Sequence, residues 1–580
     1  MPTILQRLRQ RKLFQWVLAY LAGAWLVFQA IEVLADPWGI PTALQRGLHI
    51  LLVVGFLLVL VVAWYHGESG QQRVSGPELL MIAALLGIAG LLVAVLRPGE
   101  KLELEPPEPT PVAASASGRP SVAALPFVNL SGLQGDVYFT DGIHEQILTQ
   151  LSKAGGLSVR GRTSAMEYRD SPKNLREIGR ELNARYLLEG SVFREGETVR
   201  ITVQLIDAQQ DEHLWAERYD RDLSVESLLD VQSDIAQRVA HALQAELTPA
   251  ERARIEARPT YNLQAYNLYL LGQYHWNKFA QEDIEKAIEY FEQAIAADPN
   301  YALAHAGLAD AYLALALGHG IGAAEPSETI RKAKEAGQRA LDIDDELPEA
   351  YVTLGMIKHT FDYEYAEAES MLRRAIELSP SNAQAYTRLG LLLCDLRRHD
   401  EAIAAGRRAQ ELDPLAPIIT TDLARSLVVA NRFDEAIEQA RAVIDRAPDF
   451  WIGHVYLCIN LTCKGQYAEA IAACETAWSL SGNPENLARL AGVHALAGNE
   501  SEVRRIEAQL REIAGQRYVS PLVMGLLYAR TGEDHRAIEW LRRGVEKRTG
   551  WITEIGSDPA FEHLRRYPEF QELLARLNLN

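Results

Sequence analysis

The chain has 580 residues, a formal net charge of −19 at pH 7 and a hydrophobic content of 48%. This length allows several domains, and the acidic balance argues against nucleic acid as a direct partner, because its phosphates require a basic surface. The first 97 residues carry a small basic excess, so the remainder of the chain is more acidic than the whole. An anionic lipid surface is therefore as unsuitable a partner for this remainder as nucleic acid is.

Three apolar runs, 13–34, 47–65 and 79–96, predict a membrane anchor with three transmembrane helices over residues 1–97. About 20 apolar residues in a helix cross a hydrocarbon core of about 30 Å. A cleaved signal peptide is the alternative for the first run, but that run is long for one and two more follow it. The basic stretch RLRQRK precedes the first run and predicts a cytoplasmic amino terminus.

Three crossings would place the rest of the chain in the periplasm, at the inner membrane of a two-membrane bacterium. If one run does not span, the body lies in the cytoplasm instead. Pro, Glu, Ala and Ser dominate residues 98–120, which predicts an extended linker rather than a fold.

Residues 121–247 carry the pattern of a small α/β domain. A short apolar run, SVAALPF, begins it and ends in a polar turn, as strands do. Apolar residues then recur at helical spacing between Tyr138 and Lys153, and strict alternation over 198–208 predicts a half-buried strand. The expected order is strand, helix, strand, helix, three strands and a last helix over about 224–247.

The stretches SVAALPFVNLSG, YFTDGIHEQILTQLSK, REIGRELNARYLLEGSV and VRITVQLIDAQQDEHLWAERYDR span nearly all of 121–247. This region resembles the TolB-amino-terminal-like (FlgO-like) domain of bacterial membrane proteins with tetratricopeptide tails. The resemblance implies envelope interaction and signalling, and no catalysis. Some members of such families carry a winged-helix DNA-binding domain or a nucleotide-cyclase domain before the membrane. Because only twelve residues precede the first expected span, we expect neither here.

The loop after the first strand is where many α/β enzymes place their chemistry. Its polar groups are Ser131, Asp136, Asp141, His144 and Glu145. Asp141 and His144 suit a helix N-terminal cap better than a catalytic dyad, and Asn129 and Ser131 suit a turn. The chain has no GxxxxGK, GxGxxG, GxSxG or HExxH motif, so we expect no catalytic, cofactor-binding or metal-binding residues. A small-ligand site at this loop is the alternative.

Residues 262–580 are periodic. Pro380, Pro414 and Pro448 lie 34 residues apart, and alanines repeat at the same spacing, which is typical of tetratricopeptide repeats. Small residues recur where the two helices of a repeat should cross; they are Gly355, Gly390, Ala424 and Cys458. We therefore expect an all-α superhelix with a concave groove that binds protein partners, closed by a cap over 557–579.

Four cysteines, all late in the chain, form no CxxC pair, so neither a zinc site nor a thioredoxin-type motif is supported. They are Cys394, Cys458, Cys463 and Cys474. Cys458 and Cys474 should meet between the two helices of one repeat, either as small packing residues or as a disulfide in an oxidising compartment. His319 suits a loop residue better than a metal ligand.

These features predict a multidomain chain: three transmembrane helices, a small α/β (TolB-N/FlgO-like) domain and an all-α tetratricopeptide superhelix. The predicted function is a membrane-anchored protein–protein interaction scaffold, or sensor arm, of an envelope complex. The acidic excess favours basic or neutral partner segments in the groove. The alternative is small-ligand sensing by the α/β domain, relayed to a membrane signalling partner. We expect no enzyme activity and no cofactor, because an enzyme would rest on fold analogy alone.

Overall fold

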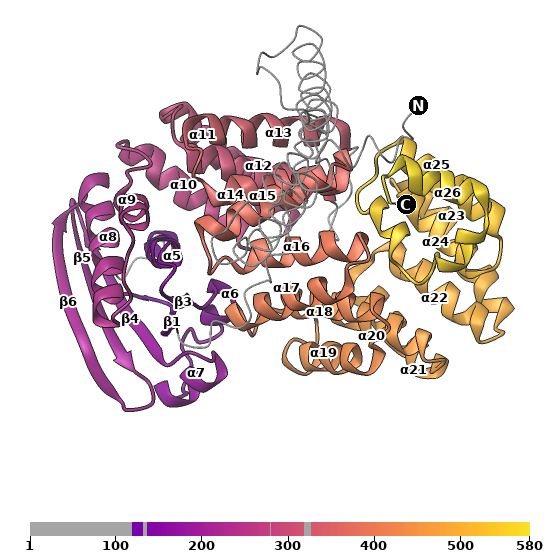
Figure 1. Ribbon diagram of the computed structural model, residues 1–580, viewed down its shortest axis with the longest axis horizontal. Coiled ribbons are helices and arrows are strands. Elements are labelled where there is room, and N and C mark those ends of the chain that lie inside the picture. The colour runs from indigo at the N-terminus through magenta and orange to yellow at the C-terminus, as the bar shows by residue number, and fades with distance from the viewer. Residues whose placement is uncertain (1–118, 132–135, 279, 318–325, 580) are drawn as a thin grey trace, which may run out of the picture. The chain divides into compact units, whose positions relative to one another are not determined.

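The computed structural model describes residues 119–131, 136–278, 280–317 and 326–579 (Figure 1). The three expected transmembrane runs, nearly all of the linker and His319 lie outside these residues. Within them, no helix combines the length and the apolar character that a membrane crossing needs. A mixed α/β domain followed by an all-α helical array is confirmed.

The α/β domain contains one sheet whose strands lie in the order β3-β1-β4-β5-β6, with β2 also paired to β4. The strands are β1 (Ser121–Ala124), β2 (Val128–Asn129), β3 (Ser158–Val159), β4 (Tyr186–Glu195), β5 (Thr198–Asp207) and β6 (Glu212–Asp222). β1 pairs in parallel with β3 and β4, and β2 pairs in parallel with β4. The pairs β4–β5 and β5–β6 are antiparallel. A turn at Gly196, with φ 59°, joins β4 to β5.

Helices cover one face of this sheet and only part of the other (Figure 1). They are α5 (Val137–Ser152), α6 (Arg162–Met166), α7 (Leu175–Glu181) and α8 (Val225–Ala242). The predicted alternation in β5 is confirmed, because Val199, Ile201, Val203 and Leu205 are buried in the core that α5 and α8 form. Helix α7 packs on the opposite face, against Ala123 and Leu187. The short β2 and α6 are additions that the sequence pattern did not predict.

After α9 (Pro249–Glu256), helices follow in antiparallel pairs through the described residues. The pairs are α10 (Leu263–Trp276) with α11 (Gln281–Ala297), α12 (Ala302–Leu317) with α13 (Pro326–Ile343), α14 (Pro348–Ile357) with α15 (Tyr365–Leu378), α16 (Ala383–Asp395) with α17 (His399–Leu412), α18 (Pro417–Val429) with α19 (Phe433–Arg446), α20 (Trp451–Cys463) with α21 (Tyr467–Ser481), α22 (Pro484–Leu496) with α23 (Glu500–Gln516), and α24 (Pro521–Arg530) with α25 (Asp534–Glu546). The chain ends with η3 (Ile552–Gly556), η4 (Glu562–Arg566) and α26 (Pro568–Arg576).

The repeat chemistry behaves as predicted. Pro380, Pro414 and Pro448 each follow a second helix that ends two residues earlier, because proline cannot continue the helical hydrogen bonds. At Gly355 a Cβ would lie 3.0 Å from Leu372 Cγ, so the crossing requires a small residue. The first helices of neighbouring repeats contact one another, which places them on the inner side of the array.

Cys458 and Cys474 join in a disulfide, with an S–S distance of 1.97 Å and a Cα–Cα distance of 5.4 Å. The bond connects α20 to α21 within one repeat. Cys394 and Cys463 are free thiols. Of the two alternatives that the sequence left open for Cys458 and Cys474, the structure contains the disulfide.

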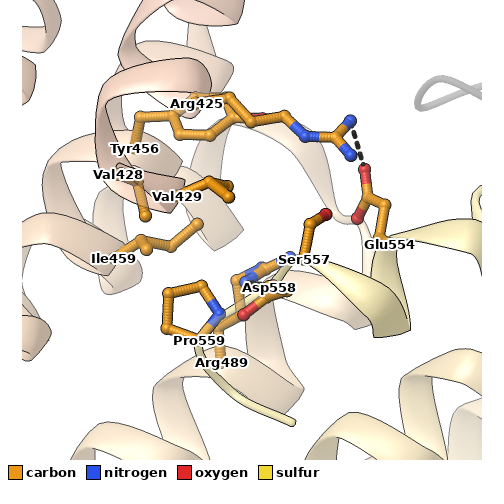
Figure 2. A pocket seen from close by; sticks show the side chains of 10 residues that line it. All are labelled: Arg425, Val428, Val429, Tyr456, Ile459, Arg489, Glu554, Ser557, Asp558 and Pro559. Carbon is orange, nitrogen blue, oxygen red and sulfur yellow. Dashed lines mark hydrogen bonds and ion pairs between the residues drawn. The ribbon is translucent and has the colours of Figure 1, made fainter. Parts of the chain in front are cut away.

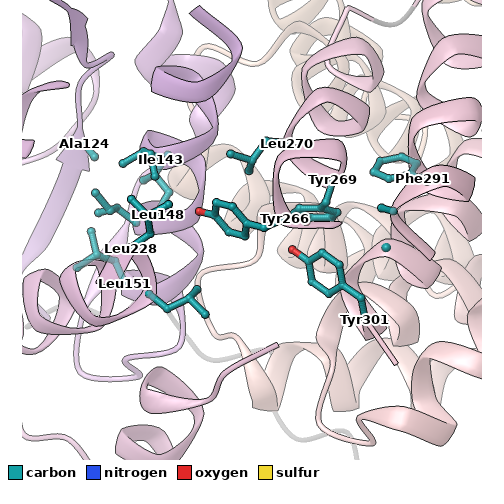
Figure 3. Packing of buried hydrophobic residues seen from close by; sticks show 14 of the residues in the cluster. Ala124, Ile143, Leu148, Leu151, Leu228, Tyr266, Tyr269, Leu270, Phe291 and Tyr301 are labelled. Atoms are coloured by element: carbon teal, nitrogen blue, oxygen red, sulfur yellow. The ribbon is translucent and has the colours of Figure 1, made fainter. Parts of the chain in front are cut away.

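The α/β domain and the first repeats share one hydrophobic core (Figure 3). Tyr266 and Leu270 of α10 pack toward Ile143 of α5, and the Tyr266 hydroxyl accepts a 2.8 Å hydrogen bond from Gln232 of α8. A Cβ at Gly142 would lie 2.8 Å from Leu270 Cδ1, so glycine sets how closely α5 and α10 approach. We call this contact the α5–α10 seam.

A second contact joins the domain to later repeats. The amide of Val159 donates to Ser381 Oγ at 3.1 Å, and the amide of Gly161 donates to the Leu412 carbonyl at 2.7 Å. Asp413 accepts from the amide of Ser164 at 2.8 Å. The sheet domain therefore contacts the repeats at two places far apart in the sequence, and the two parts form a single compact unit.

Gly142→Val tests the α5–α10 seam. The added side chain must displace Leu270, and overpacking of this kind costs about 1–3 kcal/mol. We expect the free energy of unfolding to fall by that amount in a urea titration followed by circular dichroism. Gly515→Val in α23 is the matched control, because a Cβ there meets nothing within 4 Å. Equal effects of the two substitutions would contradict a close contact at Gly142.

Candidate functional site

Residues 548–579, which we call the C-terminal segment, lie against helices of earlier repeats. Trp551 Nε1 donates to the Leu317 carbonyl, at the end of α12, at 3.1 Å. The Tyr365 hydroxyl donates to the Leu577 carbonyl at 2.6 Å. The segment therefore returns from the last repeat to the second and third, and occupies part of the inner side of the array.

Arg425 of α18 is the centre of the contacts that hold this segment. Its guanidinium lies 2.7 Å from Asp395 of α16 and 2.9 Å from Glu554 of η3, and 5.9 Å from the centre of the Trp551 ring. Ser557 Oγ donates to Asp395 at 2.8 Å. One buried arginine thus links a first helix to two positions of the C-terminal segment.

A second arginine, Arg489 of α22, has a similar arrangement two repeats further along the array. It lies 3.0 Å from Asp558 and 2.8 Å from Glu485. Arg530 of α24 lies 4.0 Å from the same Asp558. Charged pairs of this kind are stable inside a protein only when both members are present.

The environment shifts the ionisation of these groups. Burial raises the pKa of Glu554 to about 7, although Arg425 opposes the shift. Burial would also raise the pKa of Asp395, but Arg425 and His359 outweigh it and hold that pKa well below its usual range. Of the two carboxylates on Arg425, Asp395 is the permanent anion and Glu554 is the one that titrates near neutral pH.

Ser557, His359 and Asp395 resemble a hydrolase triad only in their residue types. His359 Nε2 donates to Asp395 Oδ2 at 2.9 Å, and Ser557 donates to the same carboxylate. The aspartate therefore lies between the serine and the histidine, whereas a nucleophilic serine needs the histidine beside it. This geometry holds a chain segment in place and does not activate Ser557.

A cavity of about 30 Å³ lies between these side chains (Figure 2). It is lined by Arg425, Val428, Val429, Tyr456, Ile459, Arg489, Glu554, Ser557, Asp558 and Pro559. Such a volume holds about two water molecules at most. The inner face at this point recognises a polypeptide segment and leaves no room for a small molecule.

The loop residues that the sequence singled out are structural. His144 Nε2 donates to the Ala124 carbonyl at 2.9 Å, and burial lowers its pKa to about 4, too low for a general base at neutral pH. Asn129 Oδ1 accepts from the amide of Ser131 at 2.9 Å, which confirms the predicted turn. Glu145 accepts from Asn277 of the first repeat at 2.9 Å, so it belongs to the α5–α10 seam.

The prediction that Asp141 caps a helix is wrong. Helix α5 begins at Val137, and Asp136 occupies the N-cap without a side-chain cap hydrogen bond. Asp141 is buried one turn into the helix and pairs with Arg169 at 2.5 Å. Asp136 lies 3.8 Å from Arg194 of β4. An arginine from outside the helix therefore neutralises each carboxylate, and the pattern of the helix alone could not show this.

The loop also borders an open hollow of about 590 Å³ on the face of the sheet that α7 leaves uncovered. Phe127, Val128, Lys173, Ser191 and Thr202 are among the residues that line it. Lys173 is paired with Glu181 at 2.7 Å. Within the described ranges, no group of three or more His, Cys, Asp or Glu side chains is placed to hold a metal ion.

Comparison with known families gives a different relationship from the one that the sequence pattern suggested. Residues 117–238 match the second domain of HilA/YgeH-like transcriptional regulators. Residues 278–317, 364–417 and 421–483 match tetratricopeptide repeats. The TolB-amino-terminal-like (FlgO-like) assignment is therefore wrong, whereas the repeat assignment is confirmed.

Two curated proteins are similar over much of this region. "Putative adenylate cyclase 3" of Rhizobium meliloti is 33% identical over 326 residues, 56% of this chain and 52% of that protein. "Transcriptional regulator HilA" of Salmonella typhimurium is 24% identical over 303 residues, 52% of this chain and 51% of that protein. The chain thus spans about half the length of the curated relatives it matches. A solved tetratricopeptide protein of Thermus thermophilus is 21% identical, with a TM-score of 0.29, over 34% of this chain and 99% of that one.

These matches also overturn the predicted function. The family model and one relative concern transcriptional regulators, and the other relative is named a cyclase. A membrane-anchored scaffold or sensor arm of an envelope complex is therefore not the role that the matches support. The small-ligand relay offered as its alternative lacks support for the same reason. Protein binding by the repeats stands.

Glu554→Gln tests the ionisation of the cluster. The pKa of Glu554 lies at about 7, above its ordinary value of 4.5, so the folded state binds this proton more tightly than the unfolded state. Its stabilising effect is present below pH 4.5 and is lost as the pH rises through 7. We expect the unfolding free energy of the wild type to fall over this window, by at most about 1.4 kcal/mol per pH unit from this group.

Urea unfolding at a series of pH values measures this slope. The groups that face Glu554 are Arg425 of α18, Asp395 of α16, and Glu485 and Arg489 of α22. Glu554→Gln leaves them in place and should flatten the slope. Glu539→Gln in α25, an exposed residue paired with Arg543, should keep the wild-type slope. An unchanged slope in Glu554→Gln would show that another group titrates.

Proposed function

We propose that the described part of the chain is the protein-binding module of a regulator of the HilA type. The observation that carries this proposal is the α5–α10 seam, where Gly142 admits Leu270 to within contact distance. The domain that matches the HilA/YgeH-like second domain is thereby joined to the repeats as one body. A protein bound by the repeats would act directly on the domain beside them.

We propose further that the partners are proteins, bound at the inner face of the repeats, and that this module does not itself contact DNA. The net charge of −19 supports this division, because DNA binding depends on releasing counterions from phosphates through lysine and arginine. The chain itself is proposed not to be an enzyme. A regulator of this kind would reach its promoters through a DNA-binding part or partner.

Transcript profiling tests this function. In a strain that lacks the gene, we expect a defined set of promoters to change and the wild-type chain to restore them. The Gly142→Val chain should restore them poorly, because it breaks the seam, while Gly515→Val should restore them fully. Identical transcript profiles with and without the gene would contradict a regulatory role. A mobility shift of DNA by the purified module at low salt would contradict the absence of DNA contact.

Regulation associated with a cyclase is the second candidate, because the Rhizobium meliloti protein matches 56% of this chain at 33% identity. The two candidates differ in a measurable product. A change in cyclic AMP on deletion of the gene, with transcripts otherwise unaffected, would favour this second function.

For localisation we propose the inner membrane, with the amino terminus in the cytoplasm and the soluble domains in the periplasm. The apolar runs at 13–34, 47–65 and 79–96 motivate it, and the Cys458–Cys474 disulfide supports an oxidising compartment. Alkaline phosphatase fused after Asn580 should be active, and a fluorescent protein that matures only in the cytoplasm should stay dark. The reverse result would place the repeats in the cytoplasm and contradict the proposal.

A further inference from the structure

The carboxylates of the C-terminal segment follow a regular pattern. Glu554, Asp558 and Glu562 recur at four-residue intervals, and each is paired with an arginine from the repeats. The pairs are Arg425–Glu554 at 2.9 Å, Arg489–Asp558 at 3.0 Å and Arg397–Glu562 at 2.9 Å. The three arginines belong to three different repeats: Arg425 and Arg489 lie on first helices, at the inner face, and Arg397 lies in the turn between α16 and α17.

An aromatic residue precedes these carboxylates. Trp551 places its ring 5.9 Å from the Arg425 guanidinium and its Nε1 donates to the Leu317 carbonyl at 3.1 Å. Ile552 and Ile555 beside it are buried. The inner face therefore recognises an aromatic and aliphatic anchor followed by spaced carboxylates, which is the chemistry of a peptide ligand with a hot-spot residue.

The backbone that delivers this anchor is strained. Arg548 and Trp551 have φ values of 48° and 63°, the left-handed region that bulky side chains avoid at a cost of about 1–3 kcal/mol each. The short turns η3 and η4 follow, with local backbone hydrogen bonds such as Glu554 to Trp551 and Phe561 to Asp558, each 3.0 Å, so residues 551–562 form separate turns rather than a continuous helix. Side-chain contacts with the repeats keep this stretch in place against the strain.

The end of the chain is held differently. Phe570, Leu573 and Leu574 of α26 are buried, and the Leu577 carbonyl is bound by Tyr365. If residues 551–562 leave the inner face, the chain therefore stays attached on both sides of them, through α25 before them and α26 after them.

We propose that residues 551–562 are an intramolecular ligand of the inner face, and that the external partner is a protein presenting an acidic segment of the same kind in their place. This inference deepens the proposed function and rests on it for the existence of a partner. The proposed acidic partner differs from the basic or neutral partners that the whole-chain charge favours. The arginines of the inner face select carboxylates, and the partner competes with the chain's own segment.

A peptide-binding experiment on the full chain tests this inference. The probe is a fluorescent peptide with the sequence of residues 549–563, TGWITEIGSDPAFEH. Asp558→Lys repels the chain's own segment from Arg489 and Arg530 and should vacate the face. We expect the peptide to bind Asp558→Lys at least about tenfold more tightly than the wild type. A peptide with amides in place of the three carboxylates should not bind, and adding Arg489→Glu to the Asp558→Lys chain should abolish binding.

Equal affinity for the wild type and Asp558→Lys, or no binding to either, would overturn the proposal. Hydrogen exchange on the wild type covers the case in which Asp558→Lys does not fold. Amides of 551–562 should exchange faster than those of α18, and excess acidic peptide should accelerate them. Protection equal to that of α18, unaffected by the peptide, would show that the segment is a fixed part of the core. Neither peptide binding nor hydrogen exchange depends on transcription. The failure of this inference can therefore be distinguished from the failure of the proposed regulatory function.

Discussion

The buried guanidinium of Arg425 is the constraint on which the inner face depends. A charge in this position is stable only while its partners remain, and removing one partner of such a pair typically costs about 3–5 kcal/mol. Asp395 supplies one partner from the repeats, and Glu554 supplies the other from the C-terminal segment. The array and the end of the chain are therefore specified together, since neither side satisfies the arginine alone.

The opposite end of the array is fixed by packing rather than by charge. At the α5–α10 seam, Gly142 and Leu270 set the approach of two helices, and Ser381 and Asp413 bind the loops of the α/β domain at later repeats. Stacked repeats alone contact only their neighbours. Here the sheet domain and the C-terminal segment both bridge repeats that are not neighbours, so the curvature of the array depends on elements outside it.

The sequence predicts what short-range patterns encode. The alternation in β5 and the 34-residue period of the prolines depend on neighbours within one element or one repeat, and both are confirmed. Asp141 was misassigned because the start of α5 depends on where the preceding loop ends. The partners of Arg425 lie 30 and 129 residues away in the chain, and no local spacing reveals them. The detectable signal was an arginine directly after the small residue Ala424, on the helix face that repeats normally keep apolar.

The whole-chain charge and the local arginines of the inner face favour different partners for a physical reason. Interactions between exposed charges fade beyond a Debye length of about 8 Å at physiological salt, so most of the acidic surface does not act on the inner face. Charges within about 4 Å in a partly dry site interact several times more strongly than in water. The side chains of Arg425 and Arg489 are both largely buried, and both lie within 4 Å of their carboxylate partners. The net charge of −19 therefore says little about the ligand of the inner face, and the proposed acidic ligand follows from these two arginines instead.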